Sequence, residues 1–249
     1  MKAMVLAAGL GTRLRPLTDD RPKALVEVAG RILLEITLSR LRTFGIREVI
    51  VNVHHCADMV VEYLKKNDNF GMRIEISREE TLLDTGGGLK KAAWFFLENS
   101  GDAEEPFILH NVDVISTIDL VRMVQWHRKE KALATLAVQD RDTSRYLLFD
   151  EKDQLCGRRA WRDGAPEMAR SARETHALAF SGVHAISPRF LLKMTEQGAF
   201  SIISSYLRLA GQREKILGFR ADEYYWRDLG KPENVGRVEQ DVTQGVVRI

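Results

Sequence analysis

The first half of the chain alternates short apolar runs with longer segments in which apolar residues recur every three or four positions. Short apolar runs are typical of buried strands, and the longer pattern is typical of amphipathic helices. In segment 31–44, for example, Leu34, Leu38 and Leu41 share one stripe, and Gly45 follows as a stop signal. The pattern predicts strands at 4–7, 48–53, 72–77 and 107–111, and helices at 31–44, 58–66 and 88–98.

The second half keeps both patterns in a looser order. Segment 146–159 indicates a hairpin that turns at 150–153, and the polar segment 162–174, which contains Pro166, indicates a surface loop. Further strands are predicted at 134–138, 177–186, 216–219 and 224–227, and further helices at 120–129, at 200–209 and from Pro232 onwards.

Repetition of strand, helix and strand predicts an α/β fold. We expect a three-layer, Rossmann-like arrangement: a mostly parallel mixed sheet with helices on both faces. Neither a Gly/Ser linker nor an internal repeat interrupts the sequence, so we expect residues 1–249 to form a single domain.

Composition and charge narrow the classes of partner. Hydrophobic residues make up 45% and charged residues 29%, and the formal net charge is +2, as in ordinary globular proteins. This balance gives no reason to expect a nucleic acid or membrane partner. The two cysteines, Cys56 and Cys156, lie far apart and predict reduced thiols. The apolar run at 3–10 is short and lacks a cleavage site, so we expect a cytoplasmic protein without a signal peptide.

The most informative stretch is 6–23, where a predicted strand runs into Gly9-Leu10-Gly11-Thr12. Two glycines allow a ligand to approach exposed backbone N–H groups, an arrangement that suits phosphates. Four cations follow closely and could neutralise a triphosphate; they are Arg13, Arg15, Arg21 and Lys23. The stretch is not a P-loop, which requires GxxxxGK[ST], and Leu14 stands where a dinucleotide fingerprint has its third glycine.

Two later features bear on the same site. Residues 86–88 are three consecutive glycines, which favour a compact backbone arrangement ahead of the predicted helix. The predicted strand 107–111 is followed by Val112 and Asp113. Open α/β sheets bind ligands beyond the carboxyl ends of their strands, so Asp113 stands where a metal ligand belongs. Magnesium favours one or two carboxylates together with phosphate oxygens and water.

The glycine stretch resembles the signature GxGTRxxPxTxxxPK of the sugar-1-phosphate nucleotidyltransferases, also called nucleotide-sugar pyrophosphorylases. Every fixed position of that signature is filled, by Gly9, Gly11, Thr12, Arg13, Pro16, Thr18, Pro22 and Lys23. The resemblance implies the nucleotide-diphospho-sugar transferase type of fold. Residues 1–115 would then form mainly the nucleotide-binding half and residues 116–249 mainly the sugar-binding half.

The resemblance also implies roles for individual residues. Arg13 and Lys23 are the expected catalytic residues, which contact phosphates and stabilise charge in the transition state. The family pattern W-x-D-[IVL]-G-[TK]-x-E matches at Trp226, Asp228, Gly230 and Glu233. Asp113 and Asp228 are therefore the expected ligands of Mg²⁺. The expected nucleotide-binding residues are Leu6, Ala8, Gly9, Gly11, Thr12, Arg13, Lys23, Thr85, Gly86, Gly87 and Asp113.

This chain departs from the family pattern at two places. Val112 puts a side chain where the family usually has a glycine that leaves room for close packing. The Glu-Lys-Pro segment that contacts sugar and phosphate in long members is absent. For the sugar we expect Asn111 and Gly182, the latter in an FSGI-like strand, with Arg158 or Arg159 supplying the missing charge.

The short chain, the TGGG sequence at 85–88 and the FSGV sequence at 180–183 together resemble most the N-acetylmuramate-1-phosphate uridylyltransferases of cell-wall recycling. The expected partners are a nucleoside triphosphate, UTP or GTP, and a sugar 1-phosphate, with release of pyrophosphate. A GTP-dependent mannose- or heptose-1-phosphate guanylyltransferase is one alternative, and a regulatory protein that binds nucleotide without turnover is another. Either a monomer or a homodimer is compatible with the sequence.

Overall fold

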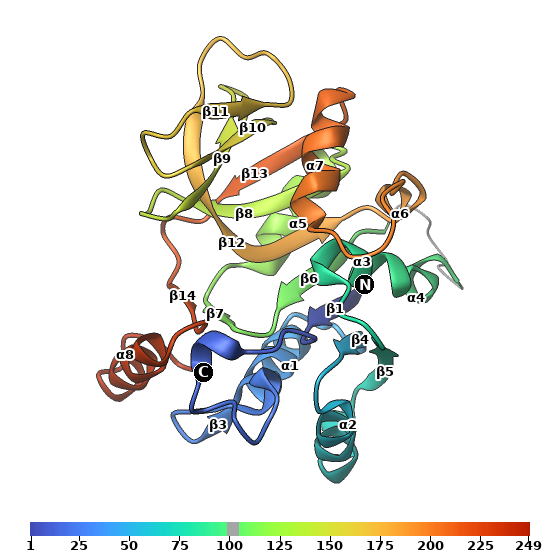
Figure 1. The fold of residues 1–249 in the computed structure, drawn as a ribbon, viewed down its shortest axis with the longest axis vertical. Helices are drawn as coiled ribbons and strands as arrows, with labels where there is room; N and C mark the ends of the chain where they lie inside the picture. The colour runs from blue at the N-terminus through green and yellow to red at the C-terminus, as the bar shows by residue number, and fades with distance from the viewer. Residues whose placement is uncertain (99–104) are drawn as a thin grey trace.

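The computed structural model of the protein describes residues 1–98 and 105–249. A ten-stranded mixed sheet runs through both halves of the chain (Figure 1). Its N-terminal half is parallel, with the strands in the order β6, β1, β4 and β5. These strands span Phe107–Asn111, Lys2–Leu6, Glu48–Val53 and Arg73–Arg78. The predicted α/β fold with a mixed sheet is confirmed.

The C-terminal half of the sheet is built around one long strand, β12 (His176–Ile186). It runs antiparallel to β6, β8 and β9, and β13 pairs parallel with β8. The remaining strands of this half span Ala134–Gln139 (β8), Arg145–Phe149 (β9), Leu155–Ala160 (β10), Pro166–Met168 (β11) and Ile216–Arg220 (β13). Two small ladders complete the strands: β7 (Val114–Ser116) with β14 (Trp226–Asp228), and β2 (Glu27–Val28) with β3 (Arg31–Ile32).

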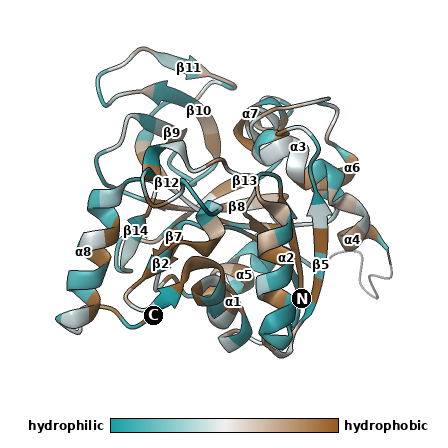
Figure 2. Ribbon diagram, turned by 60° about the horizontal axis from the view of Figure 1, so that its bottom comes forward, coloured by the Kyte–Doolittle hydropathy of each residue, from teal (hydrophilic) through white to brown (hydrophobic). Residues whose placement is uncertain are grey.

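Helices cover both faces of the sheet, because alternate residues of each strand point to opposite sides. One apolar core joins the sheet to α1 (Leu33–Thr43), α2 (Ala57–Lys66) and α5 (Leu120–Lys129). A second core joins its other face to α3 (Asp84–Lys91), α4 (Ala93–Leu97), α6 (Arg189–Leu192) and α7 (Ile202–Gly211). Figure 2 shows apolar strands enclosed by helices with hydrophilic outer faces, α2 and α8 among them.

A third, smaller core lies beside the sheet. It packs α8 (Pro232–Thr243) against Leu14 of the glycine loop and against Ile115 and Leu229 of the small β7–β14 ladder. Pro232 opens α8 as predicted. Three short 3₁₀ turns, at Thr12–Leu14, Lys23–Leu25 and Asp68–Gly71, complete the helical elements.

Several predicted boundaries were wrong. Residues 31 and 32 of the predicted helix 31–44 form β3, and α1 begins only at Leu33. The predicted helix 88–98 is two helices, and the first begins at Asp84, so the three glycines lie inside α3 rather than in a loop. The predicted surface loop 162–174 contains the short strand β11, which pairs with β10. None of the helices in the described ranges is long and apolar enough to cross a bilayer.

Candidate active site

Several of the predicted site residues lie at the carboxyl edge of the parallel strands. Leu6 is the last residue of β1, and it pairs with Asn111 at the end of β6 and with Asn52 of β4. The Asn52 side-chain oxygen accepts a hydrogen bond of 2.8 Å from the N–H of Ala7. The Val112 N–H donates one of 3.1 Å to the Leu6 carbonyl. The glycine loop and the Asp113 loop therefore leave the sheet side by side.

The glycine loop is exposed where it leaves β1 and then folds back. Gly9, Thr12 and Arg13 are exposed to solvent. Gly11 has φ +67°, and a methyl group there would lie 2.9 Å from the Thr18 side chain and 3.3 Å from Cβ of Lys23. Thr18 closes the loop, because its hydroxyl donates a hydrogen bond of 2.9 Å to the Gly11 carbonyl. Glycine at position 11 is thus what lets the loop return and bring Lys23 to the site.

The backbones of the two acids that we expect to bind metal lie side by side. Asp228 ends β14, opposite Val114 of β7, and the Leu229 N–H donates a hydrogen bond of 2.8 Å to the Asp113 carbonyl. Lys23 reaches the same point, and its ammonium forms an ion pair with a carboxylate oxygen of Asp113. The Lys23 and Asp113 side chains are only 12% and 14% exposed, so this ion pair lies largely out of water.

Arg13 completes the cluster from the other side. A methyl group at Gly230 would lie 2.6 Å from a carboxylate oxygen of Asp228 and 2.9 Å from Nη2 of Arg13. The same Asp228 oxygen accepts a hydrogen bond of 2.7 Å from the Gly230 N–H. Arg13 and Asp228 therefore face one another across Gly230. Two pairs of a cation and a carboxylate, from positions more than two hundred residues apart in the sequence, thus lie at one edge of the sheet.

The donor set at this point fits a divalent cation that is shared with a phosphate ligand. Within residues 1–98 and 105–249, His, Cys, Asp and Glu side chains form no group of three or more that could hold a metal unaided. Two carboxylates are nevertheless what magnesium takes from a protein when phosphate oxygens and water supply its remaining ligands. The arrangement thus suits a metal that binds together with a nucleotide.

Val112 does not crowd the site. Val112 is 3% exposed and belongs to the core beneath the sheet, whereas the carboxylate of its neighbour Asp113 pairs with Lys23. Successive residues of an extended segment point to opposite sides, so the extra side chain is accommodated away from the ligand side. The Val112 carbonyl accepts a hydrogen bond of 3.4 Å from the buried Thr37 hydroxyl.

The three glycines of α3 serve close packing. A methyl group at Gly86 or Gly87 would lie 2.3 Å from the Phe200 ring or 2.5 Å from the Gly198 carbonyl oxygen. The N–H groups of both glycines point to the Phe200 carbonyl, at 2.9 and 3.4 Å. Thr85 accepts a hydrogen bond of 3.0 Å from the Ile202 N–H. The compact arrangement is confirmed, while nucleotide binding by Thr85, Gly86 and Gly87 stays a prediction.

The two residues expected to bind the sugar lie against each other. Gly182 has φ +73°, in the middle of β12 where the register shifts, and a methyl group there would lie 2.9 Å from the Asn111 side-chain nitrogen. Position 182 therefore requires glycine both for its backbone conformation and for the space beside Asn111. Ser181, the preceding residue, accepts a hydrogen bond of 2.8 Å on its carbonyl from the Trp226 indole. This bond ties β12 to the strand that carries Asp228.

Arg158 lies elsewhere. It is on β10, which is separated from β12 by β9, and its exposed guanidinium forms an ion pair of 2.7 Å with Glu167 of β11. Arg159 is on the same strand. The structure does not place either arginine beside Gly182.

The sequence interpretation missed a different cation, Arg141. It follows β8 at the same edge of the sheet, donates a hydrogen bond of 2.7 Å to the Phe180 carbonyl, and stacks 3.5 Å from the centre of the Trp226 ring. Burial lowers the pKa of Arg141 to about 10, and the nearby Asp228 carboxylate opposes that shift. The guanidinium thus keeps its charge at neutral pH. Its position just beyond a predicted strand was the only signal in the sequence.

The fold is of the α/β class, and a glycine loop, two acids and arginine and lysine side chains meet at the carboxyl edge of its sheet. An edge of this kind is where open α/β sheets bind their ligands. The comparisons with known proteins agree. The family model described as nucleotidyl transferase matches residues 2–154. The chain belongs to this family, and it is a nucleotidyltransferase of the sugar-phosphate type that the resemblance predicted.

Relatives include both uridylyl- and guanylyltransferases. The chain is 35% identical to the N-acetylmuramate alpha-1-phosphate uridylyltransferase of Caulobacter vibrioides, over 93% of this chain and 92% of that protein. It is 27% identical to the mannose-1-phosphate guanyltransferase of Yarrowia lipolytica, over 94% of this chain but only 62% of that protein. The solved structure of HddC from Yersinia pseudotuberculosis complexed with GMP-PN has a TM-score of 0.75 at 20% identity, covering 97% of this chain and 99% of that one. This last similarity is one of fold.

Proposed function

We propose that the protein transfers a uridylyl group from UTP to N-acetylmuramate 1-phosphate, giving the UDP-sugar and pyrophosphate. The observation that carries this choice of substrates is the 35% identity to the Caulobacter uridylyltransferase along nearly the whole of both chains. The guanylyltransferase of Yarrowia matches at 27% and extends well beyond this chain. Transfer from GTP to mannose or heptose 1-phosphate is therefore the second candidate.

The reaction requires little proton chemistry from the protein. The attacking phosphate oxygen of the sugar 1-phosphate is already ionised at neutral pH, so the protein's task is to position two anions and to neutralise the charge that develops between them. Arg13 and Lys23 would contact the triphosphate from the glycine loop and stabilise the departing pyrophosphate. Their exposed and partly buried positions around Gly11 suit a polyphosphate that lies along the loop.

Asp113 and Asp228 would hold Mg²⁺ when the nucleotide binds. When bound, such an ion would provide Lewis acidity for the transfer of the α-phosphate. The protein's own residues fix the two carboxylates in advance, through the β7–β14 ladder and through the Gly230 N–H bound to Asp228. Lys23 shields Asp113 until then by pairing with it. Binding of metal and nucleotide would transfer Lys23 from the carboxylate to phosphate.

The two halves of the chain would divide the substrates. Residues 1–115 provide the glycine loop, Asp113 and α3 for the nucleotide. Residues 116–249 provide Gly182 for the sugar, beside Asn111 from the first half. We infer a cytoplasmic enzyme, monomeric or homodimeric, that needs neither nucleic acid nor a membrane and that supplies a cell-wall precursor.

The proposal is tested by measuring the release of pyrophosphate. The purified protein is mixed with each of four nucleoside triphosphates and with a panel of sugar 1-phosphates in the presence of Mg²⁺. The proposal expects the highest kcat/KM for UTP with N-acetylmuramate 1-phosphate. A preference for GTP with mannose or heptose 1-phosphate would select the second candidate. Nucleotide binding without release from any pair would favour a regulatory protein instead.

The metal assignment has its own test, Asp113→Asn. This change keeps the shape of the side chain but removes the charge that would bind Mg²⁺ and Lys23, so kcat should fall by about two orders of magnitude or more. Asp58→Asn, which neutralises an exposed carboxylate on α2, is the matched control and should leave kcat unchanged. Turnover of Asp113→Asn near the parent rate would show that Asp113 is not a metal ligand.

A further inference from the structure

The guanidinium of Arg141 contacts two strands of the candidate site. Its hydrogen bond to the Phe180 carbonyl fixes it two residues before Gly182 on β12. Its stack on Trp226 fixes it two residues before Asp228 on β14. Residues two apart on a strand share a face, so Trp226 and Asp228 present their side chains to the same side. Arg141 is thus attached both to the strand of the proposed sugar residue and to the strand of the proposed metal ligand.

The contacts of Arg141 leave part of its hydrogen-bonding capacity unused. A guanidinium has five N–H donors. One nitrogen, Nη2, donates to the Phe180 carbonyl, and Nε is buried without a hydrogen-bond partner among the described residues. The Trp226 face supports the cation by stacking, which provides no acceptor. A partly buried arginine with unused donors and no carboxylate bonded to it is suited to an anionic ligand.

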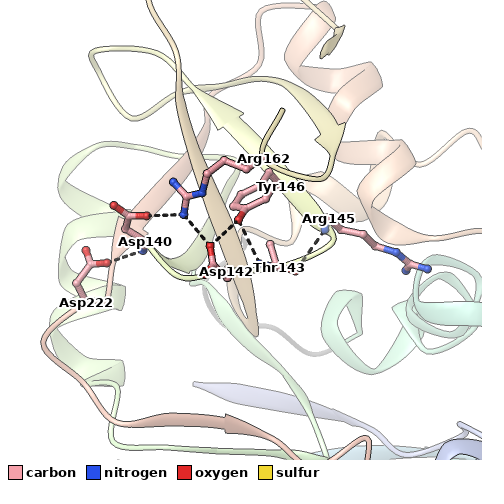
Figure 3. A network of polar contacts seen from close by, with 7 residues as sticks. All are labelled: Asp140, Asp142, Thr143, Arg145, Tyr146, Arg162 and Asp222. Carbon is pink, nitrogen blue, oxygen red and sulfur yellow. Dashed lines mark hydrogen bonds and ion pairs between the residues drawn. The ribbon is translucent and has the colours of Figure 1, made fainter. Parts of the chain in front are cut away.

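A separate network holds the loop that carries Arg141 in place (Figure 3). Arg162, from the turn between β10 and β11, bonds to both Asp140 and Asp142, at 3.4 and 3.2 Å. Asp222, which follows β13, accepts a hydrogen bond of 2.6 Å from the Asp140 N–H. The Tyr146 hydroxyl contacts the loop as well, accepting a hydrogen bond of 3.2 Å from the N–H of Thr143. The two neighbours of Arg141 are therefore anchored from three different elements, which preorganises the guanidinium between them.

We propose that Arg141 binds the phosphate group of the sugar 1-phosphate and so holds the nucleophile in position to attack the α-phosphate of the triphosphate. This inference rests on the proposed function and names the cation that takes the place of the absent Glu-Lys-Pro segment. The phosphate of the sugar substrate must lie between the sugar ring and the acid cluster, which is where the contacts of Arg141 place its guanidinium. Arg162 is a positioning residue that acts through Asp140 and Asp142.

The test compares three variants with the parent enzyme. Arg141→Ala removes the guanidinium, and Arg141→Lys keeps a charge without the planar fork. Arg145→Ala removes an exposed arginine at the start of β9, just after the loop, whose side chain points away from the network in Figure 3. A charge-assisted hydrogen bond is worth roughly 10- to 100-fold in binding. We expect Arg141→Ala to raise the KM for N-acetylmuramate 1-phosphate by about that factor. The KM for UTP should stay within about two-fold, and Arg141→Lys should be intermediate.

Two further measurements separate binding from a structural role. Guanidinium chloride at low concentration should partly restore the activity of Arg141→Ala, because a free guanidinium ion can occupy the vacated position. Thermal unfolding reports whether the variant is folded, and if Arg141→Ala is not, Arg141→Lys decides. An unchanged KM for the sugar phosphate in a folded variant would overturn the inference. So would a rise confined to the KM for UTP, which would place Arg141 on the nucleotide.

Failure of this inference is distinguishable from failure of the proposed function. If the parent releases pyrophosphate and the folded variants Arg141→Ala and Arg141→Lys keep its KM for the sugar 1-phosphate, only the proposed role of Arg141 is wrong. If the parent turns over no substrate pair, the proposed function fails. Titration calorimetry of N-acetylmuramate 1-phosphate against the parent and Arg141→Lys then still tests the phosphate contact, and equal affinities would overturn it.

Discussion

The structure allows the loss of stability in Gly182→Ala to be calculated roughly. Gly182 has φ +73°, and a non-glycine residue in the left-handed region costs about 1–2 kcal/mol. The new methyl group would also lie 2.9 Å from both the Asn111 side-chain nitrogen and Cγ2 of Val114, closer than real Cβ contacts. Displacing Asn111 and the buried Val114 adds about 1–3 kcal/mol. The free energy of unfolding should therefore fall by about 2–5 kcal/mol in total.

The assay for this prediction is urea unfolding of the parent, of Gly182→Ala and of Gly45→Ala. Gly45 has φ +77° with no heavy atom within 4 Å of the added methyl group, so it reports backbone strain alone. The difference between the two variants isolates the crowding at Asn111. In the activity assay, Gly182→Ala should raise the KM for the sugar 1-phosphate and leave the KM for UTP unchanged. Equal loss of stability in both variants, with normal KM values, would refute the reasoning about this position.

Three other changes test separate parts of the account. Val112→Ala should lower the unfolding free energy by about 1–3 kcal/mol without lowering kcat, because Val112 packs in the core; a faster variant would show that the valine does crowd the site. Gly87→Ala should destabilise the protein, since its methyl group would meet the Gly198 carbonyl at 2.5 Å, whereas Gly236→Ala in α8 has open space and should stabilise by about 0.5–1 kcal/mol. Loss of stability in both, or in neither, would contradict the packing role of the α3 glycines. Burial lowers the pKa of His127 to about 4. Between about pH 6.5 and pH 4, His127 is therefore protonated in the unfolded chain but neutral in the folded chain. The free energy of unfolding falls as the pH is lowered through that window. At pH 5 this contribution lowers the free energy of unfolding by about 2 kcal/mol. His127→Gln should therefore reduce, by that amount, the difference between the unfolding free energies measured with urea at pH 7 and at pH 5. An unchanged difference would mean that the pKa of His127 is not lowered in the folded protein.

Much of the fold follows from local patterns. The predicted bounds of β4, β6 and α5 agree with the structure residue for residue, because each is a strongly apolar or strongly amphipathic segment with clear stop signals. The helix α3 escaped prediction, since three glycines in a row indicate a loop by intrinsic preference. Contacts from Phe200 and from the loop at Gly198 stabilise the helical form there, and these lie more than a hundred residues away.

Part of the candidate site could likewise be predicted from local sequence, and part could not. Arg13, Lys23 and the loop that carries them could be predicted because the whole phosphate-binding string is contiguous in sequence. The pairing of Asp113 with Asp228 was expected from motif order, and the β7–β14 ladder supplies its physical basis. Arg141 could not be distinguished, because its importance comes only from contacts with Phe180 and Trp226 that form in the folded chain. For the same reason Arg158, which has the right charge, was assigned to a site that the structure does not place it in.

The proposed function is tested most directly by pyrophosphate release from UTP and N-acetylmuramate 1-phosphate, catalysed by the purified protein with Mg²⁺. We expect release that depends on both substrates, is abolished by chelating the metal, and is lowered at least about a hundred-fold in Asp113→Asn. Pyrophosphate release that needed no sugar 1-phosphate, or that persisted in Asp113→Asn at the parent rate, would contradict it.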